Sequence, residues 1–204
     1  MRLVVAADTT PEPWKNGGGL TRELLRLPDG DGWGLRISVA DIAADGPFSP
    51  FPGITRWFAV LEGAGVRLAF PGHAPRDLHP GDAPLRFDGG DAPGCTLLAG
   101  MTRDLNVMVR DGFGRAAVEA ARPGSRPAVP GQLATGLFAL RPLRLHVPGE
   151  PSVDVPALSL LWHAAPVDAA RPWTLELPDD TADGRAHTSA PPGYWIDLLP
   201  GAAP

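Results

Sequence analysis

Short runs in which apolar and polar residues alternate dominate the first half of the chain. The run WGLRISVA at residues 33–40 alternates with the period of two that is expected for a half-buried strand. The run LTRELLRL at residues 20–27 precedes it, and PDGDG between them is typical of a turn, so the two runs predict a hairpin. The runs TRWFAVLEGAGVRLAF at residues 55–70 and LNVMVRDG at residues 105–112 repeat this strand pattern.

The pattern is less regular in the second half. RAAVEAAR at residues 115–122 fits a short helix or a strand equally well, and the Pro-rich SRPAVPG at residues 125–131 indicates a connector. Five further short apolar runs follow between Pro, Gly and Asp: LATGLFAL, LRLHV, LSLLWH, WTLEL and YWIDLL. No run has the length and period of a long amphipathic helix. The pattern predicts an all-β protein, a sandwich or barrel, and two similar sets of strands suggest a duplicated one.

Composition and charge narrow the classes of partner. The 204 residues are 44% apolar and carry a net charge of -5, with a pI of about 5.5, which argues against nucleic acid. Cys95 is the single cysteine, so no disulfide can form within the chain. The first apolar run, residues 3–7, is too short for a signal peptide or a membrane span. We therefore expect a cytoplasmic protein without a membrane or nucleic-acid partner.

The segment PEPWKNGGGLTRE at residues 11–23 contains an unusual lysine. Lys15 is the only lysine among 18 basic residues, and it stands beside three consecutive glycines. A glycine triplet permits positive φ and close approach of a ligand or a strand. The alternative is a bend where the chain enters a barrel, with Lys15 in solvent. Because the ammonium group differs in geometry from the guanidinium used elsewhere, we interpret Lys15 as an anion contact or a proton donor.

Two segments are similar to cupin barrels. FAVLEGAG at residues 58–65 and HPGDAPLRF at residues 79–87 match the cupin hairpin and the PGD turn that follows it. Metal-binding cupins carry a His-x-His pair and a carboxylate before this hairpin and another histidine after the turn. Residues 46–62 contain no histidine here, and Arg56 occupies the slot of the glutamate ligand. We expect no metal in this barrel, and Cys95 has no neighbouring base that would make it a catalytic thiol.

Four ordered segments resemble the HutD/Ves family: PWKNGGGLTRE, DGPFSPFPGITR, VLEGAG and RDLNVMVR. The resemblance is specific over residues 1–112, and the remainder is similar only in its general pattern. It implies a bicupin, that is, two double-stranded β-helix (cupin) barrels fused in one all-β chain without a required metal or cofactor. The expected division is an N-terminal cupin barrel at residues 1–112, which carries the WKNGGG motif, and a degenerate C-terminal cupin-like barrel at residues 113–204.

The resemblance also implies a function. HutD members are associated with histidine-utilisation operons and with binding of intermediates such as formylglutamate or urocanate, as regulators rather than catalysts. We therefore expect a protein that binds a small anionic metabolite and regulates histidine utilisation, with no catalytic residues. The alternatives are a metal-independent enzyme with Lys15 and Glu23 as a proton-transfer pair, a Ves-like stress-response protein, and an interaction module without a ligand. Exposed barrel edges make a homodimer compatible with this fold.

The expected ligand site lies in the N-terminal barrel. Its predicted residues are Lys15, Asn16, Gly17, Gly18, Thr21, Glu23, Arg56 and Asn106. Thr21 and Glu23 share one face of a strand. If this face is interior, the carboxylate of Glu23 needs a partner, for which Lys15 and Arg56 are the candidates.

Arg56 alternates with Phe58 and Val60, which places it on their inward face. An arginine there can bind a carboxylate through two parallel hydrogen bonds. The alternative is an internal ion pair with Glu23 or Asp104. Trp14 and Trp57 either line the pocket or fill the core, and core is the simpler interpretation.

Overall fold

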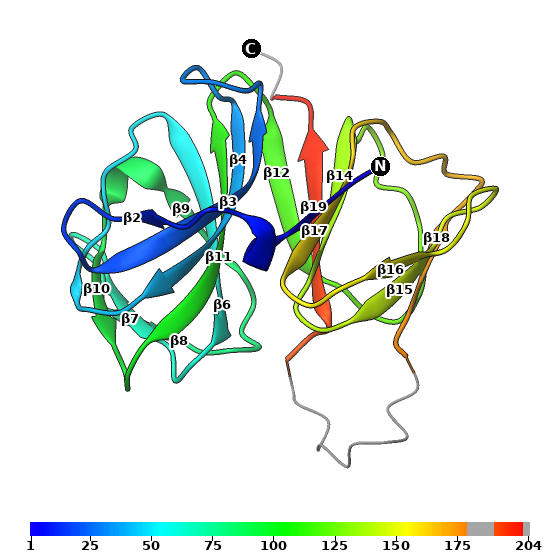
Figure 1. The fold of residues 1–204 in the computed structure, drawn as a ribbon. Helices are drawn as coiled ribbons and strands as arrows, with labels where there is room; N and C mark the ends of the chain where they lie inside the picture. The colour runs from blue at the N-terminus through cyan, green and yellow to red at the C-terminus, as the bar shows by residue number, and fades with distance from the viewer. Residues whose placement is uncertain (179–189, 202–204) are drawn as a thin grey trace. The chain divides into compact units, whose positions relative to one another are not determined.

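The computed structural model describes residues 1–178 and 190–201, and its secondary structure consists of strands and short 3-10 turns (Figure 1). The all-β prediction is confirmed. The chain forms two compact units. We call Thr9–Arg115 the N-terminal barrel, and Met1–Asp8 together with Ala116–Pro200 the C-terminal barrel.

Two sheets build the N-terminal barrel. In spatial order, one sheet consists of β2 (Glu12–Pro13), β3 (Gly19–Leu27), β4 (Leu35–Ile42), β11 (Thr102–Arg110), β6 (Ile54–Glu62) and β9 (Leu85–Asp88). The other consists of β5 (Gly46–Pro47), β10 (Gly94–Leu97), β7 (Val66–Ala69) and β8 (Arg76–Leu78), and the 3-10 turn η2 (Gly89–Asp91) follows β9. A cluster of buried apolar side chains, among them Phe48, Phe58 and Leu68, fills part of this barrel.

The predicted hairpin of residues 20–27 and 33–40 is confirmed by the antiparallel pair of β3 and β4. Its register shifts between Glu23 and Leu25, so that Leu24 is the extra residue of a β-bulge. The central strands are buried on both faces: in β4, Ile37 is 0% exposed and Ala40, which faces the opposite way, is 3% exposed. In such a strand, the alternation of apolar and polar residues separates an apolar buried face from a polar buried face. It does not separate the core from solvent.

Two sheets also build the C-terminal barrel. In spatial order, one sheet consists of β1 (Arg2–Val5), β17 (Ser159–His163), β14 (Ala134–Ala139), β19 (Gly193–Leu199) and β12 (Arg115–Ala120). The other consists of β13 (Gly124–Arg126), β18 (Trp173–Glu176), β15 (Leu143–His146) and β16 (Val153–Val155). The ambiguous run at residues 115–122 is therefore largely strand.

The first residues of the chain do not belong to the barrel that follows them. Strand β1 pairs antiparallel with β17, with Arg2 opposite Trp162 and Val5 opposite Ser159, and the 3-10 turn η1 (Ala6–Asp8) comes next. The expected boundary at residue 112 lies close to the change of unit after Arg115, but the first eight residues pair in the C-terminal barrel. A short apolar run carries no information about which distant strand it pairs with.

Apolar side chains occupy the interior of the C-terminal barrel. Leu137, Leu145 and Leu175 are 0% exposed, and Trp173 and Trp195 pack with their rings 6.3 Å apart. The helices in the described part of the chain are single short turns, and none of them has the length and apolarity to cross a membrane.

Candidate functional site

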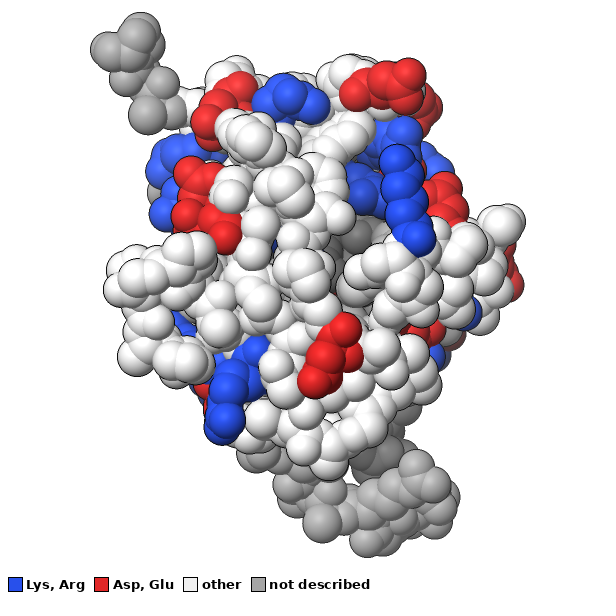
Figure 2. All heavy atoms as spheres, turned by 90° about the vertical axis from the view of Figure 1, so that its left-hand side faces the viewer, with Lys and Arg blue, Asp and Glu red and all other residues white. Residues whose placement is uncertain are grey.

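A cavity of about 460 Å³ opens in the N-terminal barrel. It is lined by Glu12, Pro13, Trp14, Lys15, Asn16, Thr21, Arg36, Ser38, Ala40, Pro47, Phe48, Ser49, Phe51, Arg56, Asn106 and Met108. Figure 2 looks onto this part of the molecule, and Lys and Arg atoms border a hollow in the surface. Three of the lining residues are cationic and one is a carboxylate, so the side chains around the cavity carry a net positive charge.

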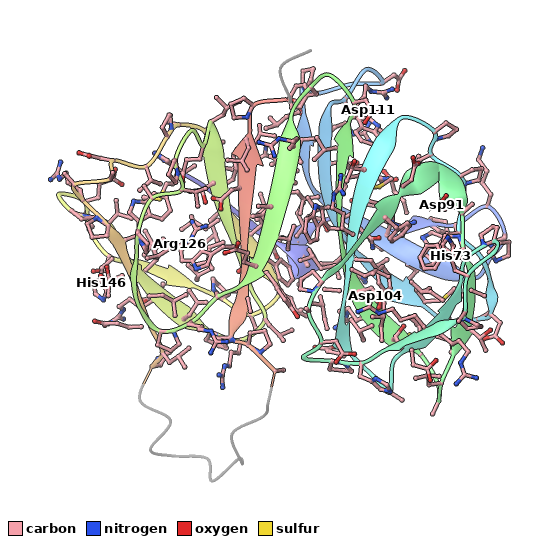
Figure 3. All side chains as sticks on the ribbon, turned by 180° about the vertical axis from the view of Figure 1, so that it is seen from behind. His73, Asp91, Asp104, Asp111, Arg126 and His146 are labelled. Carbon is pink, nitrogen blue, oxygen red and sulfur yellow. The ribbon has the colours of Figure 1, made fainter. Side chains whose placement is uncertain are left out.

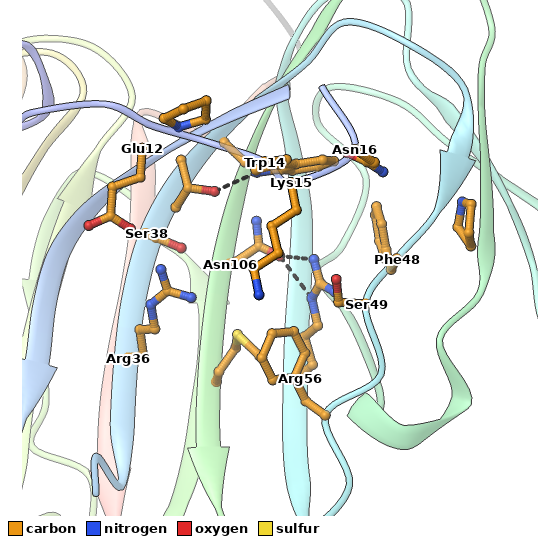
Figure 4. A pocket seen from close by; sticks show the side chains of 16 residues that line it. Glu12, Trp14, Lys15, Asn16, Arg36, Ser38, Phe48, Ser49, Arg56 and Asn106 are labelled. Carbon is orange, nitrogen blue, oxygen red and sulfur yellow. Dashed lines mark hydrogen bonds between the residues drawn. The ribbon is translucent and has the colours of Figure 1, made fainter. Parts of the chain in front are cut away.

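One wall of the cavity is the hairpin of β2 and β3 with its tight turn. The backbone N–H of Trp14 donates to the carbonyl of Gly19 at 2.9 Å, and that of Gly17 donates to the carbonyl of Trp14 at 2.9 Å. The indole Nε1 of Trp14 donates to the Thr21 hydroxyl at 2.8 Å, which fixes the ring against the strand. Lys15 stands on this turn and extends its side chain into the cavity (Figure 4).

The glycine triplet is explained by this turn. Gly17 has a φ of 71°, which side chains rarely adopt. A Cβ on Gly19 would lie 2.4 Å from the carbonyl oxygen of Asp41 and 3.2 Å from the Trp14 ring, so a larger residue would clash with the backbone of β4 and crowd the tryptophan. The Asn16 side chain accepts the N–H of Gly18 at 3.0 Å and closes the turn. The motif therefore encodes the shape of this wall.

The floor of the cavity is formed by side chains that lie side by side on one face of three neighbouring strands. Arg36 on β4 is in register with Met108 on β11, which is in register with Arg56 on β6. In the neighbouring row, Ser38 lies opposite Asn106. Because register partners share a face of the sheet, both arginines and Asn106 lie on the cavity side. Neighbouring strands are about 4.8 Å apart, so the two arginine backbones are separated by roughly 10 Å.

Arg56 is a buried cation on this floor, with 7% of its surface exposed. Its Nε and Nη2 both donate to Oδ1 of Asn106, Nε at 2.9 Å, and its Cζ lies 4.2 Å from the centre of the Phe48 ring (Figure 4). Burial lowers the pKa of Arg56 to about 10, against the opposing effect of Asp104, so the side chain is charged at neutral pH. Among the described residues, no carboxylate forms an ion pair with it.

After burial, the largest influence on the pKa of Arg56 is the carboxyl group of Asp104 (Figure 3). Asp104 is 0% exposed. Its Oδ2 accepts the Thr102 hydroxyl at 3.2 Å, and its Oδ1 has no hydrogen-bond partner among the described residues. Burial raises the pKa of Asp104 to about 8, so the group is mostly protonated at neutral pH and does not neutralise Arg56. Burial, followed by Asp104, raises the pKa of Cys95 to about 12, which makes its thiol a poor nucleophile.

The structure overturns the partners expected for Glu23. Its Oε2 accepts Nε and Nη2 of Arg26, at 3.0 and 2.6 Å, and Nε of Arg36 at 2.8 Å, rather than contacting Lys15 or Arg56. Burial would raise the pKa of Glu23, but the hydrogen bonds from both arginines outweigh it and lower the pKa. Glu23 is bound to two guanidinium groups and does not line the cavity. The alternative in which Lys15 and Glu23 form a proton-transfer pair therefore has no geometric support.

The other predicted residues divide between the cavity and its scaffold. Those that line it are Lys15, Asn16, Thr21, Arg56 and Asn106, whereas Gly17 and Gly18 shape the turn. The internal ion pair considered for Arg56, to Glu23 or Asp104, is replaced by the hydrogen bonds to Asn106.

Sequence reasoning missed Arg36 and the apolar wall of Phe48 and Phe51. It favoured core over pocket for Trp14, whereas this residue lines the cavity. The sequence signal for Arg36 was that it shares a face of its strand with Ser38, which is two residues later. Ser38 lies opposite Asn106 on the paired strand. The register that connects them became visible only in the structure.

The lining does not suit a divalent cation. It contains Lys15, Arg36 and Arg56, with Glu12 as its carboxylate, and no histidine or cysteine. Among the described residues, no group of three His, Cys, Asp or Glu side chains is placed to hold a metal ion. His73 and His146, labelled in Figure 3, belong to different barrels, and neither lines this cavity. The cavity is therefore suited to an anion.

Solved structures with this fold include close relatives. A conserved protein of unknown function from Pseudomonas aeruginosa PAO1 is 29% identical, with a TM-score of 0.78 and 98% of both chains covered. HutD from Pseudomonas fluorescens SBW25 is 27% identical, with a TM-score of 0.76 and 98% of both chains covered. Oxalate decarboxylase from Bacillus subtilis, at 11% identity and a TM-score of 0.63, shares the fold alone, which confirms the cupin prediction.

Curated relatives match over about half of their length. An uncharacterised 21.2 kDa protein in the hutC 3' region of Pseudomonas putida is 44% identical over 110 residues, 53% of this chain and 57% of that protein. Protein Ves from Citrobacter koseri is 37% identical over 109 residues, 53% of this chain and 57% of that protein. The HutD family model matches residues 6–169, across both barrels. The chain belongs to the HutD family.

Proposed function

We propose that this protein binds a small anionic metabolite of the formylglutamate or urocanate type and thereby regulates histidine utilisation. The observation that carries the proposal is the state of Arg56. Its guanidinium is buried beside the cavity, and its hydrogen-bonding partner among the described side chains is the neutral amide of Asn106. An unpaired buried cation is costly, and an anionic ligand in the cavity would supply the missing charge.

The lining supports a small carboxylate as the ligand. A volume of about 460 Å³ lies at the small end of the range for metabolite sites. Guanidinium groups bind carboxylates through short, charge-assisted hydrogen bonds, and Arg36 and Arg56 both line the cavity. The rings of Trp14 and Phe48 provide flat apolar walls, which suit the planar urocanate ring or the methylene chain of formylglutamate.

Family membership supports a role for the proposed ligand in histidine utilisation. A relative from Pseudomonas putida is described by its position beside hutC, and a solved structure similar over nearly the whole chain is a HutD. The similarity to protein Ves supports the Ves-like alternative, with a stress-response role for the same cavity. Binding without turnover distinguishes either role from the metal-independent enzyme.

A thermal-shift titration with N-formyl-L-glutamate, urocanate, glutarate and L-glutamate tests the proposal. We expect at least one of the first two to raise the melting temperature, because a ligand at 100 times its Kd stabilises by about 2.7 kcal/mol. In Arg56→Met this response should disappear. Arg67→Met is the matched control, because Arg67 is an exposed arginine paired with Asp77 outside the cavity. If neither pathway compound shifts the wild type, the proposal is wrong.

A further inference from the structure

We propose that Arg36 is a second anion-binding residue of the cavity and that Glu23 is the positioning residue that holds its guanidinium in place. The inference rests on the proposed function, because it assigns roles within the same anion site. It gives the glutamate of the WKNGGG-x-T-x-E motif a role outside the cavity lining. It also gives the cavity a second fixed cation that the motif itself does not contain.

The first support is the way in which Arg36 uses its donors. Nε is bound to Glu23 Oε2 at 2.8 Å, and the terminal Nη groups donate to no described side chain. Arg36 lines the cavity, and its guanidinium lies on the cavity side of β4 in Figure 4. An arginine held through Nε presents its terminal nitrogens in a fixed plane, ready for a ligand carboxylate.

The second support is that Arg26 and Arg36 donate hydrogen bonds to the same acceptor atom. Oε2 of Glu23 receives three N–H donors, two from Arg26 and one from Arg36. Arg26 is in register with Arg36 on the neighbouring strand, so Glu23 bridges two cations that would otherwise repel each other. The bridge neutralises Arg26 and immobilises Arg36 without occupying the cavity.

The third support is the β-bulge at Leu24. In a regular strand Glu23 and Leu25 would share a face, and Arg26 would point the other way. The extra residue sends Leu24 and Leu25 both into the core, 1% and 2% exposed, and returns Arg26 to the face of Glu23. Bulges beside functional sites commonly re-aim side chains in this manner. The sequence ELLR therefore builds the clamp on Arg36.

A further observation shows that the two cavity arginines affect each other. Arg36 lowers the pKa of Arg56, in addition to the larger effect of burial. Two guanidinium groups on one floor, separated by Met108 in the same row, need an arrangement that keeps each from turning toward solvent. For Arg56 the restraint is Asn106, and for Arg36 it is Glu23.

Substitution of Glu23 distinguishes a positioning role from simple electrostatics, because the two predict opposite changes in ligand affinity. Glu23→Gln removes a negative charge beside an anion site, so electrostatics alone predicts tighter binding of N-formyl-L-glutamate or urocanate. Positioning predicts weaker binding, by about 10-fold, since roughly 1.4 kcal/mol of preorganisation is lost. Glu23→Asp keeps the charge but shortens the side chain, and positioning again predicts a loss, where electrostatics predicts no change. Calorimetric titration of the full chain with both compounds gives the affinities.

The control is Glu62→Gln, because Glu62 is an exposed carboxylate paired with Arg103 and absent from the lining. It should leave the affinity within twofold. Arg36→Lys, which keeps the charge but loses the Nε donor, should weaken binding to a similar extent as Glu23→Gln. Unchanged or tighter binding in Glu23→Gln with a folded protein would overturn the positioning role.

A second readout does not depend on a ligand. In the wild type the Nε–H of Arg36 should give an NMR signal protected from solvent exchange, assigned by its absence in Arg36→Lys. Glu23→Gln and Glu23→Asp should weaken that protection, and persistence of full protection in both would contradict the clamp. If no compound binds the wild type, the proposed function and the binding role of Arg36 fail together, while this signal still decides whether Glu23 positions it.

Discussion

Both barrels contain an arginine stacked on an aromatic ring, but the two arginines have different partners. In the C-terminal barrel, Arg126 lies with its Cζ 4.3 Å from the centre of the Trp195 ring, and its Nη2 donates to Asp197 at 2.5 Å (Figure 3). The Thr135 hydroxyl completes this network by donating to Asp197 at 2.7 Å. In the N-terminal barrel the corresponding partner of Arg56 is the amide of Asn106.

The difference shows two ways in which the same barrel architecture can treat a buried arginine. We call a barrel closed when a carboxylate of the chain pairs with the arginine, and receptive when its charge is left unpaired beside a cavity. Asp197 is 1% exposed and ionically paired, so the charge of Arg126 is satisfied within the chain. Arg56 donates two hydrogen bonds to a neutral amide oxygen, which does not compensate its charge, and it lines an open cavity. The cavity found in the C-terminal barrel, of about 170 Å³, does not include Arg126 in its lining. A neutral acceptor in place of a carboxylate therefore leaves the charge of Arg56 uncompensated by its hydrogen-bonding partner, as the proposed anion binding requires.

The largest effect should follow from breaking the closed network. Asp197→Ala leaves Arg126 as a largely buried cation without its carboxylate, and such losses cost about 3–5 kcal/mol. Urea unfolding of the full chain, followed by tryptophan fluorescence, measures this change. Asp154→Ala is the control, because Asp154 is 75% exposed in its pair with Arg144 and should cost about 1 kcal/mol or less. Equal losses in the two variants would show that the closed network contributes no more than a surface pair.

The N-terminal barrel should reveal its own buried carboxyl group through the pH dependence of stability. Burial raises the pKa of Asp104 to about 8 in the folded state from its ordinary value of 3.8, so the folded chain binds more protons than the unfolded chain between these two pH values. Stability should therefore fall as pH rises from 5 to 8, by roughly 3 kcal/mol from this group. Asp104→Asn should remove that part of the slope in free energies of unfolding measured at pH 5, 6.5 and 8.

Asp77→Asn is the control for this pH series. Asp77 is an exposed carboxylate whose pKa is lowered by its hydrogen bond from Arg67. Its stabilising contribution is present throughout pH 5 to 8, so its removal should shift the whole curve without changing the slope. A slope in Asp104→Asn equal to that of the wild type would mean that Asp104 is ionised in the folded barrel.

Much of the fold was accessible from the sequence because strand alternation and turn residues are local signals. The hairpin at residues 20–40 and the inward position of Arg56 both followed from a period of two. The pairing of β1 with β17 was not accessible, since it joins segments more than 150 residues apart. Pairing over such a separation depends on the closure of a barrel rather than on any local pattern.

The site was only partly accessible for a related reason. Lys15 and Arg56 could be identified because each is chemically unusual where it stands. Arg36 could not, because it was one of 17 arginines, on the polar side of a strand taken to be half-buried. The partner of Glu23 depended on a one-residue bulge, which reverses the face of every later residue in β3.

Converting the receptive barrel toward the closed one tests the comparison directly. Asn106→Asp places a carboxylate where Arg56 already donates two hydrogen bonds, so the chain itself supplies the missing charge. We expect binding of N-formyl-L-glutamate or urocanate to weaken by about 30-fold, the equivalent of roughly 2 kcal/mol. Asn16→Asp makes the same change of charge on the cavity wall, and should weaken binding less, because Asn16 bonds Gly18 and not Arg56. If calorimetric titrations show equal losses of affinity in Asn106→Asp and Asn16→Asp, the effect at Asn106 is general electrostatics and not pairing with Arg56.

The smallest effect concerns the threonine of each barrel. Thr135 is 0% exposed and donates to a carboxylate, so Thr135→Val should cost about 2 kcal/mol of stability. Thr21 is half-buried and accepts the neutral indole N–H of Trp14, so Thr21→Val should cost about 1 kcal/mol or less. Thr21→Val should nevertheless weaken ligand binding, because it frees the ring that forms a wall of the cavity, whereas Thr135→Val should not. Paired urea unfolding and ligand titration of both variants separate these effects. Loss of binding in Thr135→Val alone would contradict the proposed anion site in the N-terminal barrel.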